Sequence, residues 1–116
     1  MVKIYFIDNQ KLKPHEQTRK NYLVKLTRQI KNDGLIKKPI LVDRQTKIIL
    51  DGHHRSDAAK LLGWRRVPVR LVNYQSPKIT VSSWRKNVTV TKVKVINAGL
   101  SGKLLLPKTS KHQKVK

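Results

Sequence analysis

The sequence of 116 residues contains no cysteine, which excludes disulfide bonds, thiolate metal sites and thiol chemistry. It has no run of about 18 apolar residues, so it predicts no membrane-spanning helix. Its first residues, MVKIYFIDNQ, lack the ordered basic, apolar and small-residue regions of a signal peptide. We therefore expect a cytoplasmic protein with no membrane partner, and the length suits a single domain over residues 1–116.

Acidic and aromatic residues are both scarce. Six Asp and Glu stand against 27 Lys and Arg, which gives a formal net charge of +21. Such an excess favours contact with polyanions such as nucleic acid or nucleotide phosphates, although a general gain in solubility also accounts for it. The basic residues are spread along the chain, which favours non-specific binding over sequence reading. Aromatic residues make up 5% of the chain, too few for a base-stacking platform.

The few acids stand beside histidines. Glu16, the only glutamate, follows His15, and Asp51 precedes the adjacent pair His53 and His54. A solvated surface does not require the groups suited to acid–base chemistry to be bunched in this way. These two segments are therefore the first candidates for a functional site.

Apolar spacing predicts strands that alternate with helices. Leu23, Leu26 and Ile30 recur at helical spacing, with Asn21 as the N-cap and Gly34 ending the helix. A second helix follows residue 52 and ends at residue 63. Strands are predicted over residues 3–7, 38–43, 48–52 and 65–73, with a strand or loop over 77–87.

The remaining segments are less regular. Pro68 favours an edge position or a strand start for residues 65–73. Residues 88–102 fit a strand through their β-branched residues, or a helix through Val93, Ile96 and Leu100 with Gly102 at its end. From about residue 107 the sequence predicts a basic, flexible tail. The element order predicts a compact α/β (α+β) domain with a small mixed sheet and flanking helices.

The stretch ILDGHHR lies where a predicted buried strand gives way to a helix. A helix start presents backbone N–H groups and the positive end of the helix dipole to an anion. Gly52 permits a sharp turn, Arg55 supplies a forked cation, and the two histidines add donors. Asp51 is suited to bind Mg²⁺ or to accept a proton. Alternatively, Asp51 is only an N-cap and the histidines are exposed; a zinc site is disfavoured because adjacent residues diverge.

The segment from PILVD through IILDGHHRSDAAKLLGWRRVPVRLV resembles the ParB/sulfiredoxin superfamily, whose small α/β fold binds nucleotides through a Gly-x-x-Arg turn at a helix start. Sulfiredoxins need a cysteine at the position of His53, so their chemistry is excluded. Partition-type ParB proteins carry later glutamates that this chain lacks after Glu16, which disfavours that branch. A ParB-like nucleic-acid-binding protein or nuclease remains an alternative.

Archaeal free-serine kinases of this superfamily resemble the chain in four segments: LKPHE, DGHHR, WRK and LSGKLLLPKTSKH. The resemblance implies a phosphotransferase that uses ADP or ATP with Mg²⁺ to convert free L-serine into O-phosphoserine, as a monomer or homodimer. It implies that Glu16 is the catalytic base and that Asp51 is a catalytic and metal-binding residue. It assigns the remaining residues to the nucleotide phosphates (Gly52, His53, His54, Arg55, Lys108 and Thr109) and to the amino-acid substrate (His15, Trp84, Ser110 and His112).

Two departures from this resemblance stand out. The segment between the tryptophan motif and the tail motif is short in this chain. Lys111 also stands where the family tends to have arginine, which replaces a bidentate fork with a point charge.

Overall fold

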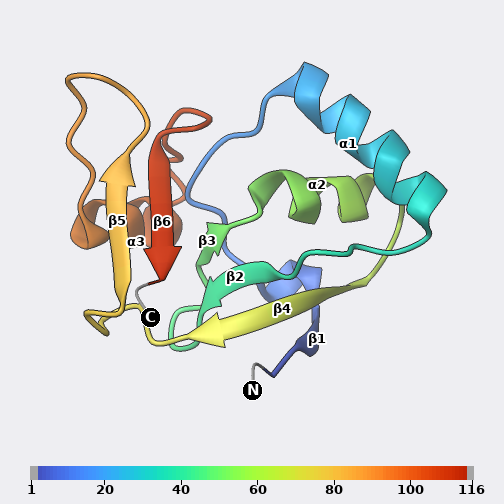
Figure 1. Cartoon of the computed structure of the whole chain (residues 1–116), viewed down its shortest axis with the longest axis horizontal. Coiled ribbons are helices and arrows are strands. Elements are labelled where there is room, and N and C mark those ends of the chain that lie inside the picture. Colours follow the sequence, from blue (N-terminus) through green and yellow to red (C-terminus); the bar gives the residue numbers. More distant parts are fainter. Residues whose placement is uncertain (1–2, 115–116) are drawn as a thin grey trace.

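The chain forms three α-helices, one 3₁₀ helix and six strands over residues 3–114, the part that a computed structural model describes (Figure 1). The elements are, in order, β1 (Tyr5–Asp8), η1 (Asn9–Lys11), α1 (Lys20–Asp33), β2 (Ile40–Asp43), β3 (Ile49–Asp51), α2 (His53–Leu61), β4 (Arg66–Val72), β5 (Ile79–Ser83), α3 (Lys92–Ser101) and β6 (Ser110–Lys114). The predicted compact α+β fold with a mixed sheet and flanking helices is confirmed.

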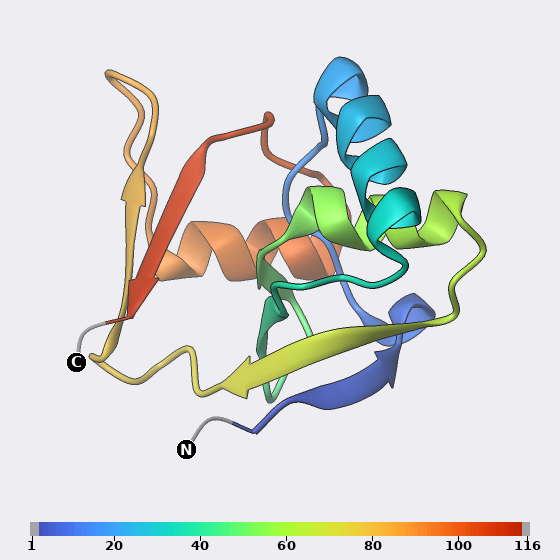
Figure 2. The same cartoon turned by 45° about the vertical axis from the view of Figure 1, so that its right-hand side comes forward.

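Four strands form a mixed sheet in the order β1-β4-β2-β3, and β5 pairs with β6 in a separate antiparallel sheet. Strands β2 and β4 are parallel, with Ile40 opposite Val69, and the other neighbours are antiparallel. The helices α1 and α2 lie together on one side of the four-stranded sheet, while α3 starts near β5 and β6 and runs across from them, behind α2 and β3 in this view (Figure 2). Residues 3–114 include no helix with the length and apolar character needed to cross a membrane.

Both faces of β2 are covered by apolar side chains. Successive side chains of a strand point to opposite faces, so Ile40 and Val42 join one buried cluster and Leu41 joins another. The first cluster holds Ala58 and other residues of α1, α2 and β4. The second holds Val95 of α3 together with residues of β3 and β5. The apolar run ILV therefore reflects burial on both sides, as in parallel sheets.

The helix ends follow local backbone rules, with one exception. Gly34 and Gly102 adopt left-handed conformations at the C-caps of α1 and α3, which confirms both predicted helix ends. The predicted N-cap at Asn21 is wrong, because α1 begins at Lys20 and its N-cap, Arg19, makes no side-chain capping bond. The Arg19 N–H is instead bound by His54, which fixes the entry to α1 through a tertiary contact.

The structure corrects the prediction of an edge strand at Pro68. Strand β4 is central, and Pro68 lies opposite Phe6 of β1. The missing N–H is tolerated because the parallel pairing with β2 begins one residue later, at Val69.

The end of the chain also differs from expectation. Residues 110–114, predicted as part of a flexible tail, form β6 because β5 offers a partner strand along its full length. Residues 115 and 116 of that predicted tail lie outside the described residues. Residues 92–101 form a helix, but Val93 and Leu100 of the predicted apolar stripe are exposed, and Val95, Ala98 and Gly99 are buried instead.

Gly99 lets α3 approach the sheet closely. A Cβ atom at this position would lie 2.7 Å from both Cδ1 and Cγ1 of Ile48, a side chain that is completely buried. The side chain of Ile48 cannot move without disturbing its own cluster. Glycine is therefore a packing requirement here, although it weakens a helix interior.

We expect Gly99→Ala to lower the free energy of unfolding by about 1 kcal/mol or more, because overpacking outweighs the roughly 1 kcal/mol gain in helix propensity. Urea unfolding measures the change. The matched control is Asn97→Ala on the exposed side of α3, which should be neutral or stabilising. Adding Ile48→Val, which removes Cδ1, should recover part of the loss. Equal or greater stability of Gly99→Ala would contradict the packing argument.

Candidate active site

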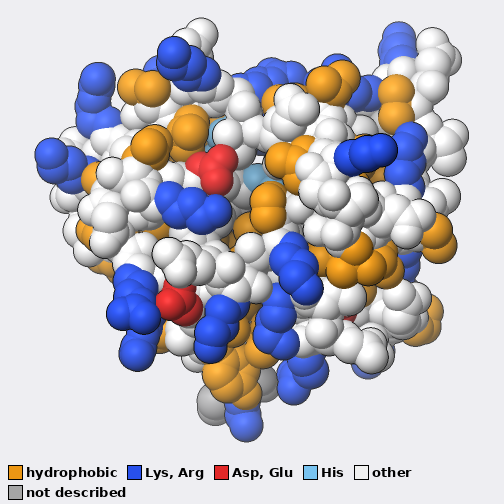
Figure 3. Space-filling view, turned by 180° about the vertical axis from the view of Figure 1, so that it is seen from behind, with side chains coloured by type: hydrophobic (Ala, Val, Ile, Leu, Met, Phe, Trp, Pro, Cys, Tyr) orange, Lys and Arg blue, Asp and Glu red, His pale blue; other side chains and the backbone are white. Residues whose placement is uncertain are grey.

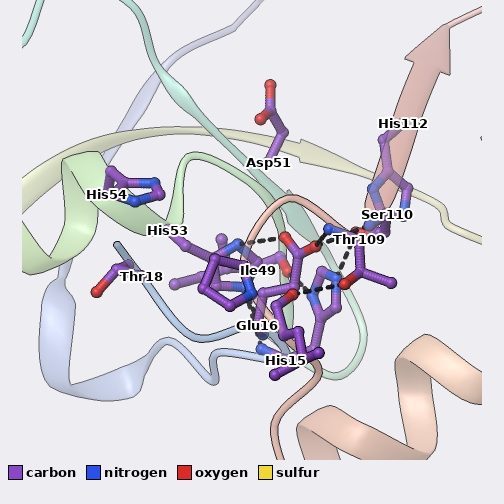
Figure 4. A network of polar contacts seen from close by, with 12 residues as sticks. His15, Glu16, Thr18, Ile49, Asp51, His53, His54, Thr109, Ser110 and His112 are labelled. Atoms are coloured by element: carbon purple, nitrogen blue, oxygen red, sulfur yellow. Dashed lines mark hydrogen bonds and ion pairs between the residues drawn. The ribbon is translucent and has the colours of Figure 1, made fainter. Parts of the chain in front are cut away.

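A cavity of about 330 Å³ lies where the first turn of α2 meets the loop before α1 and the start of β6. It is lined by nine of the residues singled out from the sequence: Glu16, Asp51, Gly52, His53, His54, Arg55, Trp84, Lys108 and Ser110. Three others, His15, Thr109 and His112, do not line it. Segments far apart in the chain thus supply one site (Figure 4).

The first turn of α2 forms one wall of the cavity. Its first helical hydrogen bond runs from the Ser56 N–H to the carbonyl of Gly52, so the N–H groups of residues 53–55 have no acceptor within the helix. Gly52 has a φ of 107° and offers no capping side chain. These N–H groups and the helix dipole make this wall suited to phosphate.

Gly52 also makes room for Arg55. A Cβ atom at position 52 would lie 2.9 Å from Nη2 of Arg55. The Nη1 of Arg55 donates to the carbonyls of Lys38 and Pro39 at 2.9 and 3.0 Å, and its Nη2 lies 3.5 Å from Oδ2 of Asp51. The guanidinium is therefore held beside the first turn of α2 with a fixed orientation.

Glu16 is held by backbone amides. Its Oε1 accepts hydrogen bonds from the N–H groups of Thr109 and Ser110, each at 2.7 Å. Its Oε2 lies 3.8 Å from Nδ1 of His53. The loop that carries Glu16 is anchored because the Gln17 N–H donates to Leu105, whose own N–H donates to the carbonyl of His15. A carboxylate held at one oxygen keeps the other available for a proton.

The ring of His53 is fixed in one tautomer. Its Nε2 accepts from the N–H groups of His15 at 3.0 Å and Glu16 at 3.3 Å, so the proton of the neutral ring is on Nδ1, facing Glu16. Burial holds the pKa of His53 well below its usual value, and the neighbouring His15 lowers it further. His53 is therefore a neutral donor and not a base.

His15 is completely buried beneath the cavity. Its Nδ1 donates to the carbonyl of Ile49 at 2.6 Å, which leaves Nε2 to accept from the hydroxyl of Ser110 at 2.8 Å. Burial lowers the pKa of His15 to about 4. Both ring nitrogens are occupied, so His15 supports the residues that line the cavity.

His54 and Asp57 join α2 to the segment before α1. The Nε2 of His54 accepts from the Arg19 N–H at 2.9 Å, so its own N–H is on Nδ1. Burial lowers the pKa of His54 and keeps the ring neutral. One turn further along α2, Asp57 accepts from the Thr18 hydroxyl at 2.8 Å. His54 therefore presents a donor at the cavity while it orders the start of α1.

The ring of His112 lies beside that of His15, with centroids 5.7 Å apart, and Asp51 lies at the edge of the cavity that holds Glu16. His112 is hydrogen-bonded through Nε2 to the Tyr74 hydroxyl at 2.8 Å, and burial lowers its pKa to about 4. With Arg70 and others it lines a neighbouring cavity of about 340 Å³, to which Asp51 and Lys38 also contribute. The carboxylate of Asp51 points away from Glu16 (Figure 4). Asp51 therefore stands at the boundary between the two cavities.

Cations and aromatic rings form the outer part of the site. Lys108 lies over the ring of Tyr22 at 5.0 Å, and Lys111 lies over Trp84 at 4.6 Å. Trp84 is 58% exposed and is not part of a core. The Thr109 hydroxyl donates to the carbonyl of Leu106, so this residue contributes its backbone to the site and its side chain to the turn.

The residues fit a magnesium ion that is bound partly by the protein and partly by a ligand phosphate better than they fit an enclosed metal centre. Residues 3–114 hold no group of three or more His, Asp or Glu placed to bind a metal ion. Mg²⁺ commonly takes one or two carboxylates, with phosphate and water as the other ligands. Asp51, half exposed at the cavity edge, fits that donor set.

Five residues that line the cavity are not among the predicted site residues: Gln17, Tyr22, Leu26, Lys38 and Leu50. Tyr22 and Leu26 are four residues apart on α1, a spacing that places them on one face of a helix. Lys38 was one of 27 cations with no distinguishing neighbour. Its role depends on how the segment before β2 passes Arg55.

The neutral histidines make stability depend on pH. The pKa of His15 falls from an unfolded value near 6.5 to about 4, and those of His53, His54 and His112 are also lowered by burial. The unfolded chain therefore binds more protons below pH 6.5, and stability is lost between about pH 6.5 and 4. For His15 the slope approaches roughly 1.4 kcal/mol per pH unit.

We expect the urea midpoint to fall from pH 7.0 to pH 5.0, and to fall less steeply in a His15→Gln variant. The lowered pKa values of Asp8 and Asp43 act only below their usual value of 3.8, outside this window. A midpoint that stays constant over this range would show that the histidines are not buried as neutral rings.

Comparison with known proteins agrees with the fold. Residues 1–88 match the ParB N-terminal domain. The chain is 33% identical over 82 residues to an ATP-dependent L-serine kinase of Staphylothermus marinus, an alignment that covers 67% of this chain and 32% of the relative. It is 32% identical over 83 residues to an ADP-dependent L-serine kinase of Thermococcus kodakarensis. That alignment covers 68% of this chain and 34% of the relative. The chain thus spans about a third of the length of these relatives.

A solved structure described as a free serine kinase in complex with AMP superimposes with a TM-score of 0.67 and 32% identity. The superposition covers 72% of this chain and 36% of that one. The family match extends over β1 to β5 and includes the strand–turn–helix that carries Gly52 and Arg55. The chain belongs to the ParB N-terminal domain family, as its resemblance to the ParB/sulfiredoxin superfamily indicates.

Proposed function

We propose that this protein transfers a phosphoryl group from ADP or ATP to the hydroxyl of free L-serine and so forms O-phosphoserine. The observation that carries the proposal is that one cavity holds the Glu16 carboxylate and the first turn of α2 together. Phosphoryl transfer needs little more than an aligned nucleophile, a nearby base and neutralised phosphate charge. The names of the relatives supply the substrate class.

Glu16 is the group in the cavity best suited to accept the hydroxyl proton. The ring nitrogens of His53 and His54 that lack a proton accept backbone N–H groups, so neither is free to act as a base. Asp51 points away from this centre and faces Arg55. The proton would pass from the serine hydroxyl to Oε2 of Glu16. The serine oxygen would then form a bond to the terminal phosphorus as the bond to the nucleotide leaving group breaks.

The opposite side of the cavity is suited to the phosphates. The N–H groups of the first turn of α2, the guanidinium of Arg55, and the ammonium groups of Lys38 and Lys108 surround the same space. Fixed donors of this kind stabilise the charge that builds up on the transferred group. Mg²⁺ held by Asp51 and the nucleotide phosphates would add further neutralisation. Trp84 and Ser110 also line the cavity, and the Ser110 N–H contacts Glu16, so the amino acid would sit beside Ser110.

The test is formation of O-phosphoserine from L-serine, with ADP and ATP offered separately. We expect Glu16→Gln to lower the turnover number at least about a hundredfold, because it removes the base while keeping the shape of the side chain. Nucleotide affinity, measured by calorimetry, should change less than about threefold, because the phosphate-binding groups remain.

The matched control is Asp33→Asn, which removes a carboxylate at the C-terminal end of α1 that pairs with Lys37 and does not line the cavity. This variant should keep full activity. Absence of product from the unmodified protein with either nucleotide would refute the proposed function. A fully active Glu16→Gln variant would refute the assignment of the base.

A second candidate, single-stranded nucleic-acid binding, is favoured by the surface beside the cavity. Trp84, Arg19, Arg85 and Lys108 line a shallow depression of about 400 Å³, which joins an exposed ring to three cations. On the face seen from behind the positive charge is diffuse: Lys and Arg side chains are scattered over it without forming one band (Figure 3). One tryptophan supplies a single stacking position and not a platform.

If this candidate holds, affinity for a single-stranded oligonucleotide should fall at least about tenfold between 50 and 200 mM salt, through loss of counterion release. Quenching of tryptophan fluorescence on binding should disappear in Trp84→Phe and persist in Trp64→Phe. Failure to bind at 50 mM salt would remove this candidate and leave the kinase proposal untouched.

A further inference from the structure

We infer that the backbone at the start of β6 positions Glu16: the N–H groups of Thr109 and Ser110 hold Oε1, so that Oε2 alone receives the proton of the acceptor hydroxyl. The inference rests on the proposed function and deepens it. It assigns a positioning role to two backbone amides that no side-chain motif records. It also makes the C-terminal strand part of the machinery around the base.

The geometry leaves little freedom at Oε1. Two N–H groups reach this oxygen at 2.7 Å, short distances that are typical of charge-assisted bonds. Two donors occupy both of its lone pairs. Within residues 3–114 Oε2 accepts no hydrogen bond, and Nδ1 of His53 lies 3.8 Å from it, which is longer than a hydrogen bond. The two oxygens are therefore distinct, and the free one faces the start of α2.

The two amides are themselves fixed by the turn that precedes β6. The Thr109 hydroxyl donates to the carbonyl of Leu106 at 2.6 Å, and Arg85 binds both that hydroxyl and the carbonyl of Pro107. The Trp84 N–H donates to the Thr109 carbonyl at 3.0 Å. Lys108 takes a φ of 55°, which turns the chain so that the next two N–H groups point the same way.

Ser110 is also held through its side chain. Its hydroxyl donates to Nε2 of His15, the ring that is completely buried under the cavity. The amide of Ser110 thus lies between two anchored points, the turn before it and His15 beneath it. A rigid pair of donors aligns a base without using a second charged group, so the alignment does not depend on a titrating partner.

The direct test uses NMR on the unmodified chain. As the pH falls, protonation of Glu16 weakens both bonds, so the amide signals of Thr109 and Ser110 should shift with the same midpoint as the Glu16 carboxyl carbon. Glu16→Gln should abolish this shared transition. Amide signals that do not follow the carboxyl carbon would overturn the inference. Because this readout needs no turnover, an inactive protein with the shared transition would refute the proposed function alone.

The variant pair Ser110→Pro and Ser110→Ala separates the amide from the hydroxyl. Both lose the bond to His15, but only Ser110→Pro loses the N–H, and proline is tolerated at the first residue of a strand. Relative to Ser110→Ala, we expect Ser110→Pro to lower kcat at least about tenfold and to move the acid limb of the pH–kcat profile up by about one pH unit. Nucleotide Kd should stay within about threefold. Equal kcat and equal pH profiles in the two folded variants would overturn the inference.

Discussion

The arrangement of the site depends on one buried polar contact, the ring of His15 between the carbonyl of Ile49 and the hydroxyl of Ser110. These partners are 34 and 95 positions away in the sequence, on β3 and on β6. A buried ring with two nitrogens must find two partners, since an unsatisfied polar group inside a protein costs roughly 1–3 kcal/mol. By meeting that requirement His15 holds the two sheets together at the point where Glu16 enters the cavity.

Local rules predicted much of the fold. The apolar runs of β2 and β3, the glycine ends of α1 and α3, and the strand–turn–helix around Gly52 are each set by residues close in sequence. The features that the sequence did not predict depend on contacts between segments that are far apart in the chain. Pro68 is tolerated in a central strand because of where β2 begins, and β6 forms because β5 is available. The buried face of α3 is set by the approach of Ile48 to Gly99 and not by the most apolar stripe.

The candidate site also combines residues from one short stretch with groups contributed by distant segments. The residues proposed to bind phosphate lie mostly within one short stretch, DGHHR, so a local motif brings them together. The proposed base, Glu16, lies in a loop, and its Oε1 is held by backbone amides near the other end of the chain. Backbone donors leave no mark in the residue types, which explains why Thr109 was expected to contribute through phosphate contact. Lys38 and Tyr22 reach the cavity from segments whose composition is ordinary for this chain.

The adjacent histidines of DGHHR combine structural and ligand-facing roles. Each uses one ring nitrogen to accept a backbone N–H, His53 from the segment that carries Glu16 and His54 from the start of α1. Because both rings are neutral, each retains one N–H on its other nitrogen. Side chains that follow one another at a helix start diverge, so a single turn can tie down two different segments. Burial keeps these rings uncharged, and the positive charge at the phosphate side therefore comes from Arg55, the lysines and the helix start. These groups lie across the cavity from the Glu16 carboxylate, the proposed base.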